Sequence, residues 1–302
     1  MPEVITSIGE ILIDFLPIVE NGATVGFRMH VGGSPYNVAM GLARLGQPVA
    51  FAGKIANDFF GRVMREHVER EGIDTRFLIN TDALTTLAFV AYEHGEPAYS
   101  FYGEGAADTL VTAGDLPAAL FDDTRILHFG SISLLRGSTP GAVEFAVERL
   151  KGRALLSFDP NLRPGLVRDE AGYRALLERL FRQADLVKIS SADLGWLMPG
   201  APLAEAAAAL RAYGPALVVV TRGGDEVLAC ASAVGGGSLP GATLPSFAVA
   251  PAGPPDDLAH RLRLGAPPVV GRIADGRLLL DMRTVLEQQE AELIVAVRAS
   301  RS

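Results

Sequence analysis

A strand, a helix and a second strand can be read directly from residues 155–189, LLSFDPNLRPGLVRDEAGYRALLERLFRQADLVKI. The apolar run at 155–159 predicts a buried strand, and apolar residues at helical spacing predict a helix over 171–184. A second apolar run follows at 186–189. Two strands joined through a helix run parallel in a sheet, so this stretch predicts an α/β protein.

The same alternation extends along the chain in both directions. It adds a strand at 125–130 and a helix at 139–150 on one side, and a helix at 203–213 and a strand at 217–221 on the other. The order predicts a mainly parallel sheet with helices on both faces. Ligands of such sheets bind outside the carboxyl ends of the strands. Four polar residues stand at predicted strand ends: Asp14, Asp159, Lys188 and Thr221.

Shorter elements precede this region. Residues 4–16 form an apolar, β-rich run that predicts one strand, and the turn GGSP at 32–35 opens a helix over 36–45. Two β-rich runs, 87–92 and 98–102, flank a four-residue turn and predict a hairpin.

Composition and charge exclude several classes of function. Of 302 residues, 49% are hydrophobic and 21% are charged, which is typical of a soluble globular protein. The formal net charge of -8 argues against nucleic acid and anionic membranes as partners, and no apolar run is long enough to span a bilayer. The single cysteine excludes an internal disulfide, and the start shows no signal-peptide pattern, so a cytoplasmic protein is expected. The five histidines show no metal-ligand spacing, so no metal site is predicted.

The sequence pattern changes near Cys230. The glycine-rich stretch 235–241 predicts a joint. Beyond it the pattern predicts a helix at 256–264, a hairpin within 269–283 and a final helix at 286–299. This end of the chain is therefore expected to form a small αββα unit.

The first chemical constellation joins Asp14 with Gly32, Gly33 and Asn37. A carboxylate at a strand end can accept two hydroxyl hydrogen bonds, as a sugar ligand requires. Paired glycines let the backbone approach a ligand closely. The alternative is a strand-end aspartate beside an ordinary tight turn.

The second constellation is Asp159, Asn161 and Arg163 on one loop after a strand. An arginine placed there can bind a phosphate with two parallel hydrogen bonds. The alternative is a helix cap and turn, since Asp, Asn and Pro favour both.

The third constellation is Thr221 with Gly223 and Gly224 at the end of a strand. A hydroxyl and two glycines suit a nucleotide phosphate or ribose. An ordinary Gly-Gly turn is the alternative.

In order and spacing these motifs resemble those of the PfkB (ribokinase-like) carbohydrate kinases, most closely the fructokinases, over residues 1–228. The similar segments are Ile8–Asp14, Gly32–Ala39, Gly53–Gly61 (with Ala56 where a glycine is usual), Tyr99–Asp108, Asp159–Pro164 and Ala184–Ser190. The resemblance implies a three-layer α/β/α fold with a small β lid. It also implies ATP- and Mg²⁺-dependent phosphoryl transfer to a hydroxyl of a sugar such as fructose or 2-keto-3-deoxygluconate.

The resemblance also implies roles for individual residues. Those expected at the sugar and the transferred phosphate are Asp14, Gly32, Gly33, Asn37, Tyr99, Phe101, Asp159, Asn161 and Arg163. Those expected at the nucleotide are Lys188, Ser190, Asp193, Thr221, Gly223 and Gly224. The family's magnesium-linked Asn-x-x-Glu motif is degenerate here, because Ser190 and Asp193 replace its two polar residues.

The resemblance stops before the family's second signature, a Gly-Ala-Gly-Asp stretch at a helix start. Its amides stabilise the developing phosphate charge, and its aspartate takes the proton from the sugar hydroxyl. Residues 225–302 contain no such stretch, so no catalytic base is assigned. Asp256 and Asp257 open a helix without the glycines and are interpreted as its N-cap.

Residues from 232 onward are similar instead to the C-terminal region of selenocysteine synthase (L-seryl-tRNA selenium transferase). The similar stretches are 232–240, 244–246, 268–273 and 275–283. The large domain and cofactor lysine of that enzyme have no counterpart, so no pyridoxal phosphate is expected. These resemblances predict a chimera of two domains. Residues 1–228 form a kinase domain that lacks its C-terminal catalytic segment, and residues 229–302 form a small α/β domain.

Three hypotheses of function stay open at this point. The chain is a sugar kinase, impaired or inactive; a non-catalytic protein that binds a sugar or nucleotide; or a fused gene product without activity. The expected partner is a small sugar or sugar acid. Loss of the segment that covers the nucleotide half of the sheet would expose the edge strand at 217–221, which favours homo-oligomers.

Overall fold

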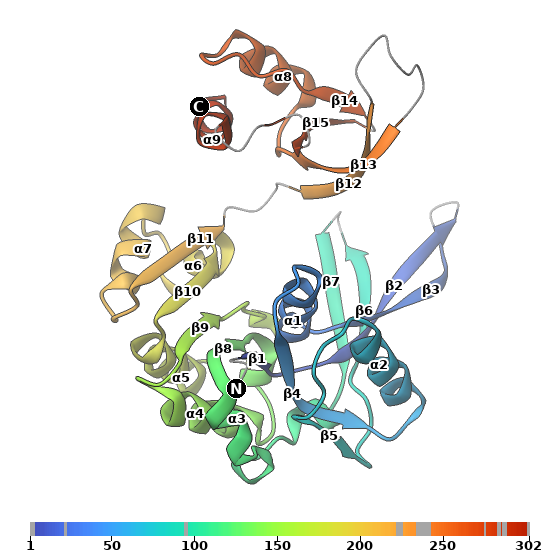
Figure 1. Ribbon diagram of the computed structural model, residues 1–302, viewed down its shortest axis with the longest axis vertical. Helices are drawn as coiled ribbons and strands as arrows, with labels where there is room; N and C mark the ends of the chain where they lie inside the picture. Colours follow the sequence, from blue (N-terminus) through green and yellow to red (C-terminus); the bar gives the residue numbers. More distant parts are fainter. Residues whose placement is uncertain are drawn as a thin grey trace. The chain divides into compact units, whose positions relative to one another are not determined.

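The computed structural model divides the chain into two compact units, Met1–Thr221 and Arg222–Ser302 (Figure 1). The residues that it describes are 4–20, 23–93, 96–221, 226–233, 243–274, 276–282, 285 and 289–300. Within them no helix is both long and apolar enough to cross a lipid bilayer.

A seven-stranded parallel sheet forms the centre of the first unit. Its strands are β1 (Val4–Ile8), β4 (Val49–Ala56), β5 (Leu78–Thr81), β8 (Thr124–Gly130), β9 (Leu155–Asp159), β10 (Leu186–Ser190) and β11 (Leu217–Thr221). Their order is β11-β10-β9-β8-β1-β4-β5. The strand β11 is therefore an edge, and no strand of the described residues pairs with its outer side.

Helices cover both faces of this sheet. They are α1 (Ser34–Arg44), α2 (Phe59–Arg70), α3 (Ala118–Asp123), α4 (Thr139–Leu150), α5 (Glu170–Gln183), α6 (Ser191–Leu197) and α7 (Leu203–Arg211). Alternate residues of a strand point to opposite faces. Accordingly Val4 and Ile8 pack in the core beneath α4 and α5, whereas Ile5 packs in the core beneath α1 and α2. The predicted three-layer α/β/α fold is confirmed.

The predicted single strand over 4–16 is wrong, because the chain turns at Gly9. Gly9 has φ +150°, and a Cβ there would lie 2.6 Å from the Pro35 side chain, so only glycine fits. The continuation, β2 (Leu12–Glu20), leaves the main sheet and pairs with β3 (Ala23–Gly32), a strand that the sequence pattern did not reveal. The predicted β lid is thus larger than its hairpin.

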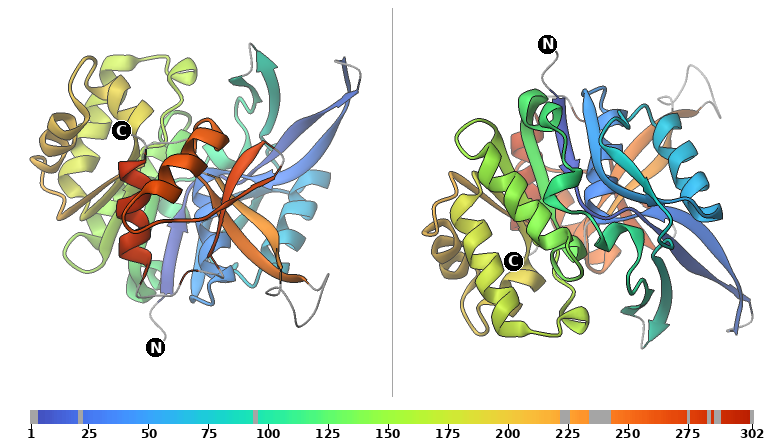
Figure 2. Two further views of the ribbon diagram at one scale, coloured as in Figure 1. Left: turned by 90° about the horizontal axis from the view of Figure 1, so that it is seen from above. Right: turned by 90° about the horizontal axis from the view of Figure 1, so that it is seen from below.

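The hairpin itself is confirmed as β6 (Leu87–Glu93) and β7 (Glu96–Tyr102). It joins β2 and β3 in a four-stranded sheet of order β3-β2-β6-β7. The β2–β3 ribbon extends away from the main sheet (Figure 1, Figure 2). This second sheet carries the beginning of β2, with Asp14, to the carboxyl ends of the main strands.

The second unit is a four-stranded antiparallel sheet with two helices. The strands are β12 (Glu226–Ala233), β13 (Thr243–Ala250), β14 (Arg272–Ala274) and β15 (Arg277–Asp281), in the order β12-β13-β15-β14; the helices are α8 (Pro255–Leu264) and α9 (Glu290–Ala299). Leu258, Leu262, Leu278, Leu280 and Ala296 form its core. The predicted helix, hairpin and helix are present, and β12 and β13 add two strands to them.

Two details of this region differ from the sequence-based expectations. The expected boundary after residue 228 falls inside β12, whereas the compact units divide after Thr221. The N-cap of α8 is Pro254, so Asp256 and Asp257 lie in the first helical turn instead of capping the helix. Carboxylates in a first turn interact favourably with the helix dipole, which gives both residues a structural role.

Candidate functional site

Six of the residues predicted to contact a sugar line one cavity of about 360 Å³. They are Asp14, Gly33, Asn37, Phe101, Asn161 and Arg163. They come from the lid strands β2 and β7, from the start of α1 and from the loop after β9. The cavity therefore lies where the lid meets the carboxyl ends of the main strands, as the sheet topology predicts.

The carboxylate of Asp14 depends on a glycine in the neighbouring strand. Gly32 is buried, and a Cβ at its position would lie 2.0 Å from Oδ2 of Asp14. Burial raises the pKa of Asp14, and the nearby charges of His30 and Arg163 act against that rise. Asp14 accepts no hydrogen bond from the residues that the structure describes. Its oxygens are thus held at the cavity without a hydrogen-bond donor among the described residues.

The next glycine, Gly33, has a different role. Its φ is +113°, and a Cβ there would lie 2.5 Å from the backbone oxygen of Glu10. The chain can therefore pack tightly against the backbone of Glu10 and Ile11 before α1 begins. Asn37, one turn into α1, is exposed and lines the cavity.

Glu10 is a functional candidate that sequence reasoning missed. It is fully buried, it lines the cavity, and it accepts hydrogen bonds from the backbone N–H groups of Ser34 (3.0 Å) and Ser133 (3.1 Å). Burial raises the pKa of Glu10 to about 7. Its carboxylate links the start of α1 to η3 (Ser131–Leu134), a short helix after β8. An acidic residue inside an apolar run was the available signal.

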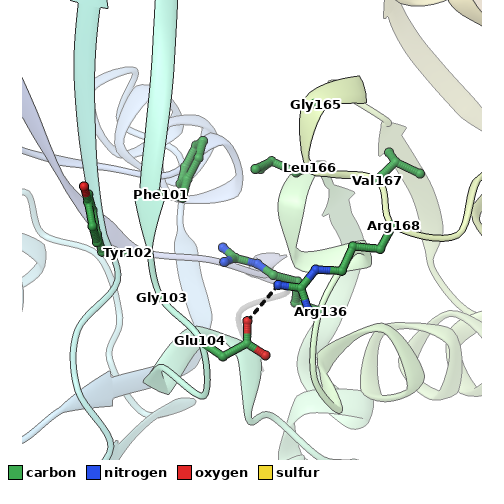
Figure 3. A pocket seen from close by; sticks show the side chains of 9 residues that line it. All are labelled: Phe101, Tyr102, Gly103, Glu104, Arg136, Gly165, Leu166, Val167 and Arg168. Atoms are coloured by element: carbon green, nitrogen blue, oxygen red, sulfur yellow. Dashed lines mark hydrogen bonds and ion pairs between the residues drawn. The ribbon is translucent and has the colours of Figure 1, made fainter.

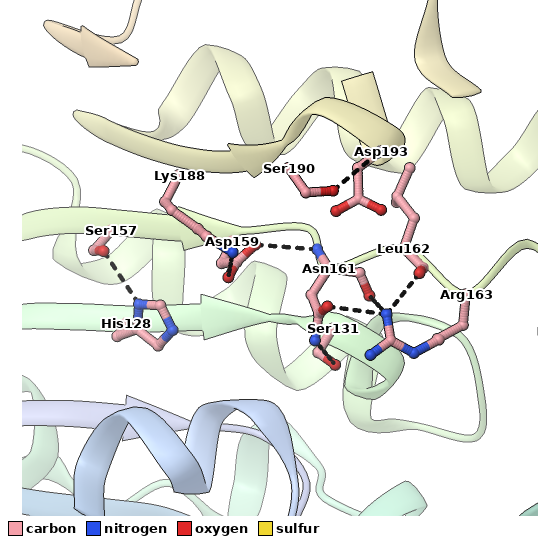
Figure 4. Close-up of polar contacts among 10 residues, drawn as sticks. All are labelled: His128, Ser131, Ser157, Asp159, Asn161, Leu162, Arg163, Lys188, Ser190 and Asp193. Carbon is pink, nitrogen blue, oxygen red and sulfur yellow. Dashed lines mark hydrogen bonds and ion pairs between the residues drawn. The ribbon is translucent and has the colours of Figure 1, made fainter. Parts of the chain in front are cut away.

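The loop after β9 is organised by its own polar groups (Figure 4). Asn161 adopts φ +38°, and its side-chain amide donates to Oγ of Ser131 at 3.3 Å. Nη1 of Arg163 donates to Oδ1 of Asn161 at 2.9 Å and to the backbone oxygen of Leu162 at 2.8 Å. These bonds hold the Arg163 guanidinium at the cavity, near Asp14.

Asp159 does not line the cavity that contains Asp14 but forms an ion pair with Lys188. Its Oδ2 accepts from Nζ of Lys188 at 3.0 Å, and its Oδ1 accepts from the backbone N–H of Asn161 at 3.2 Å. Burial raises the pKa of Asp159, and the Lys188 ammonium opposes that rise. The pair therefore connects β9 and β10 and orients the loop that holds Arg163 (Figure 4).

The residues expected at the nucleotide are only partly brought together. Ser190 and Thr221 stand side by side at the ends of β10 and β11. The Ser190 hydroxyl accepts from the backbone N–H of Asp193 at 3.0 Å and so caps α6. Tyr99 lies in β7 with its side chain outside the described part, and Gly223 and Gly224 lie outside the described residues. No group of three or more His, Cys, Asp or Glu side chains suited to a metal occurs within the described ranges.

Comparison with known sequences identifies the family of this fold. The sequence model of the pfkB family carbohydrate kinases matches residues 3–246. The chain belongs to this family. Fructokinase of Rhizobium leguminosarum bv. trifolii is 38% identical to this pfkB-family chain over 218 residues, which cover 72% of the chain and 66% of the relative. Fructokinase-1 of Zea mays is 38% identical over 204 residues, with 65% and 62% covered.

The solved structure of Xylella fastidiosa fructokinase with bound ATP has a TM-score of 0.67 and 31% identity to this pfkB-family chain. The match covers 74% of the chain and 70% of that structure. The chain thus spans just under two thirds of the length of the curated relatives named above. A second sequence model, L-seryl-tRNA selenium transferase, matches residues 218–286. Both predicted resemblances are therefore confirmed.

Proposed function

We propose that residues 1–221 bind a small sugar of the ketohexose or sugar-acid class, and that this chain by itself transfers phosphoryl groups poorly. One observation carries the sugar-binding proposal. The half-buried Asp14 carboxylate lines a cavity with Asn37, Asn161 and Arg163, and it accepts no hydrogen bond from the described residues. Buried polar groups are normally paired, so the arrangement suits a ligand rich in hydroxyl groups.

The chemistry of the cavity wall supports the same class of ligand. Ionised Asp14 accepts hydrogen bonds from two hydroxyls, while the Asn37 and Asn161 amides can both donate and accept. Phe101 contributes an apolar wall from the lid. The similarity to fructokinases in sequence and structure supports a ketohexose in particular.

The nucleotide half of the site is less complete. Among the described residues, Lys188 forms an ion pair with Asp159 and the Ser190 hydroxyl caps α6, so both groups already have a structural partner. Figure 4 shows the Asp193 carboxylate turned towards the loop that holds Arg163. The Xylella fructokinase structure contains ATP, which supports ATP as the nucleotide of this fold. On this proposal, the described residues supply a cavity for the sugar and only part of a site for the nucleotide phosphates.

We expect weak phosphoryl transfer because two catalytic features are absent from the sequence: the aspartate that acts as the base and the glycine-rich helix start whose N–H groups stabilise the transition state. Residues 225–302 contain no Gly-Ala-Gly-Asp stretch, so the family's base is not supplied at its usual place. A positioned base typically contributes about 10²–10⁴-fold in rate, and one oxyanion donor about 10²–10³-fold. The two losses act on one transition state and need not multiply. Turnover is expected far below the roughly 1–100 s⁻¹ of typical kinases.

Two measurements test the proposal separately. Calorimetric titration with D-fructose should show binding that Asp14→Ala weakens strongly and Asp122→Ala leaves unchanged, because Asp122 is an exposed residue of α3. Equal heats of fructose binding from Asp14→Ala and wild type would refute the assignment of the sugar site to Asp14. A coupled assay of ADP release with fructose and 2-keto-3-deoxygluconate tests the second part. Sugar-dependent turnover near one per second, lost in Asp256→Asn or Asp257→Asn, would show that α8 supplies the base.

A further inference from the structure

A second cavity, of about 520 Å³, adjoins the sugar cavity and shares the Phe101 side chain with it. One wall is the end of β7 and the residues after it, from Phe101 to Glu104. The other wall is the loop from Gly165 to Arg168, and Arg136 also lines the cavity. Figure 3 shows that Arg136 and Arg168 both project into the space between these walls.

Arg136 is the unusual member of this cavity. Its Nε and Nη2 atoms are buried and have no hydrogen-bond partner among the described residues. A guanidinium stays charged in proteins, and burying its N–H groups unpaired costs free energy. These two atoms lie on the same edge of the guanidinium, which is the edge that binds a carboxylate or phosphate with two parallel hydrogen bonds.

Groups near Arg136 offset its charge only in part. Its guanidinium lies 6.0 Å from the centre of the Phe101 ring, a distance at which a cation–π contact is weak. Burial raises the pKa of Asp108, and the charge of the nearby Arg136 opposes that rise. The Asp108 carboxylate nevertheless accepts its hydrogen bond from the hydroxyl of Thr86. The unpaired edge of Arg136 therefore has no acidic partner in contact with it among the described residues.

Arg168 adds a second positive charge at the mouth of the cavity. Nη2 of Arg168 lies 3.1 Å from Oε2 of Glu104, and both side chains are about four-fifths exposed, at 80% and 78%. An ion pair so exposed is worth little, because solvent screens it. Glu104 is thus a weakly held counter-ion that a better-placed anion can replace.

We infer that this cavity is a binding subsite for a small oxyanion, a carboxylate or phosphate group held by Arg136 and Arg168. Rotation about the terminal bonds of Arg136, which already lines the cavity, turns its unpaired edge towards the bound group. Arg168 then exchanges Glu104 for the same anion. The anion is either the acid end of a sugar acid that also occupies the adjoining cavity or a separate small anion. Only the first of these rests on the proposed sugar site.

The experiment is calorimetric titration of the full chain at constant ionic strength with three probes: D-gluconate, D-fructose and inorganic phosphate. Variants are Arg136→Gln, Arg168→Gln and Glu104→Gln, with Arg179→Gln as the control. Arg179 is a half-exposed arginine of α5 paired with Glu144, so it matches Arg168 in chemistry but lies outside the cavity. Because Arg168 is exposed, Arg168→Gln keeps the test valid if Arg136→Gln does not fold.

Each arginine variant should weaken binding of an anion about 10- to 100-fold, the usual value of a charge-assisted hydrogen bond. Glu104→Gln should strengthen it, because a competing carboxylate is removed. Arg179→Gln should have no effect.

If the arginine substitutions weaken the binding of gluconate but not that of fructose, the anion is the acid end of a sugar. If the substitutions weaken only the binding of phosphate, the subsite binds a free anion. Anion binding with no response to either arginine, or no anion binding at all, would overturn the inference. If D-fructose alone does not bind, the result counts against the proposed sugar site and not against the anion subsite.

Discussion

Replacing Gly32 by alanine is expected to weaken sugar binding while the fold is retained. A Cβ at this position would lie 2.0 Å from Oδ2 and 3.0 Å from Cγ of Asp14. The next nearest atom, Cδ1 of Leu12, would lie at 3.7 Å, an ordinary contact. The added methyl group therefore collides only with the end of one flexible side chain. Asp14 must rotate away from the cavity to make room.

The size of the effect follows from what the rotation removes. Hydrogen bonds between a carboxylate and hydroxyl groups are worth about 1.5–3 kcal/mol each. Loss of one such bond raises the dissociation constant about 10- to 100-fold. Stability should change by no more than about 1 kcal/mol, because alanine also lowers the conformational entropy of the unfolded chain. Gly32→Ala should thus separate binding from folding.

The assay is calorimetric titration with D-fructose, paired with urea unfolding of the same samples. Gly26→Ala is the matched control, because Gly26 lies in the same strand and its Cβ would meet only Cδ1 of Ile18, at 3.8 Å. If Gly32→Ala binds fructose as tightly as Gly26→Ala does, the assignment of Asp14 as the sugar ligand is wrong. A large loss of stability in Gly32→Ala would refute the claim that only Asp14 moves.

Three further predictions concern stability and association. Gly33→Ala should destabilise the first unit by at least about 2 kcal/mol in urea unfolding, since its φ is +113° and its Cβ would meet the Glu10 backbone; a smaller loss would contradict the packing described. Burial raises the pKa of Glu10 from 4.5 to about 7, so the native state holds a proton that the unfolded chain has released. The contribution of Glu10 to stability should therefore fall by about 3 kcal/mol between pH 4.5 and 7, and the difference between Glu10→Gln and wild type in urea unfolding should grow with pH over that range; a constant difference would count against it. Val219, 40% exposed on the edge strand β11, should promote self-association, and Val219→Lys should reduce it in size-exclusion chromatography with light scattering, unless wild type is already a monomer at every concentration.

Much of the main sheet was predictable because its strands are buried on both faces. Such strands form continuous apolar runs, and β8, β9 and β10 were recognised in this way. The strand β11 was recognised from its apolar run too, although it is an edge strand whose residues are exposed or half-buried. The motifs around Asp14, Gly33 and Arg163 were also visible, because each combines residue types with a clear chemical use. The parallel order then predicted that their side chains gather at one edge of the sheet.

The sequence alone did not show where the first strand ends. The run 4–16 is mostly apolar, but Gly9 packs so closely against Pro35 that the chain must turn and enter a different sheet. A close approach between residues distant in the chain leaves no local pattern. The strand β3 was missed for a related reason: most of its residues are exposed, so it lacks the alternation that marks a half-buried strand.

The sequence by itself determined the fold class, the family and the chemical types present at the cavity proposed to bind a sugar, because those depend on local patterns and on short motifs. Only the tertiary structure decided which polar groups are buried and whether they have partners. Glu10 accepts hydrogen bonds from Ser34 and from Ser133, which is 123 positions away in the chain, and Arg136 meets Arg168 at a cavity that no motif marks. Burial and pairing are properties of contacts between distant segments, and they set both the charge state of Glu10 and the unpaired edge of Arg136.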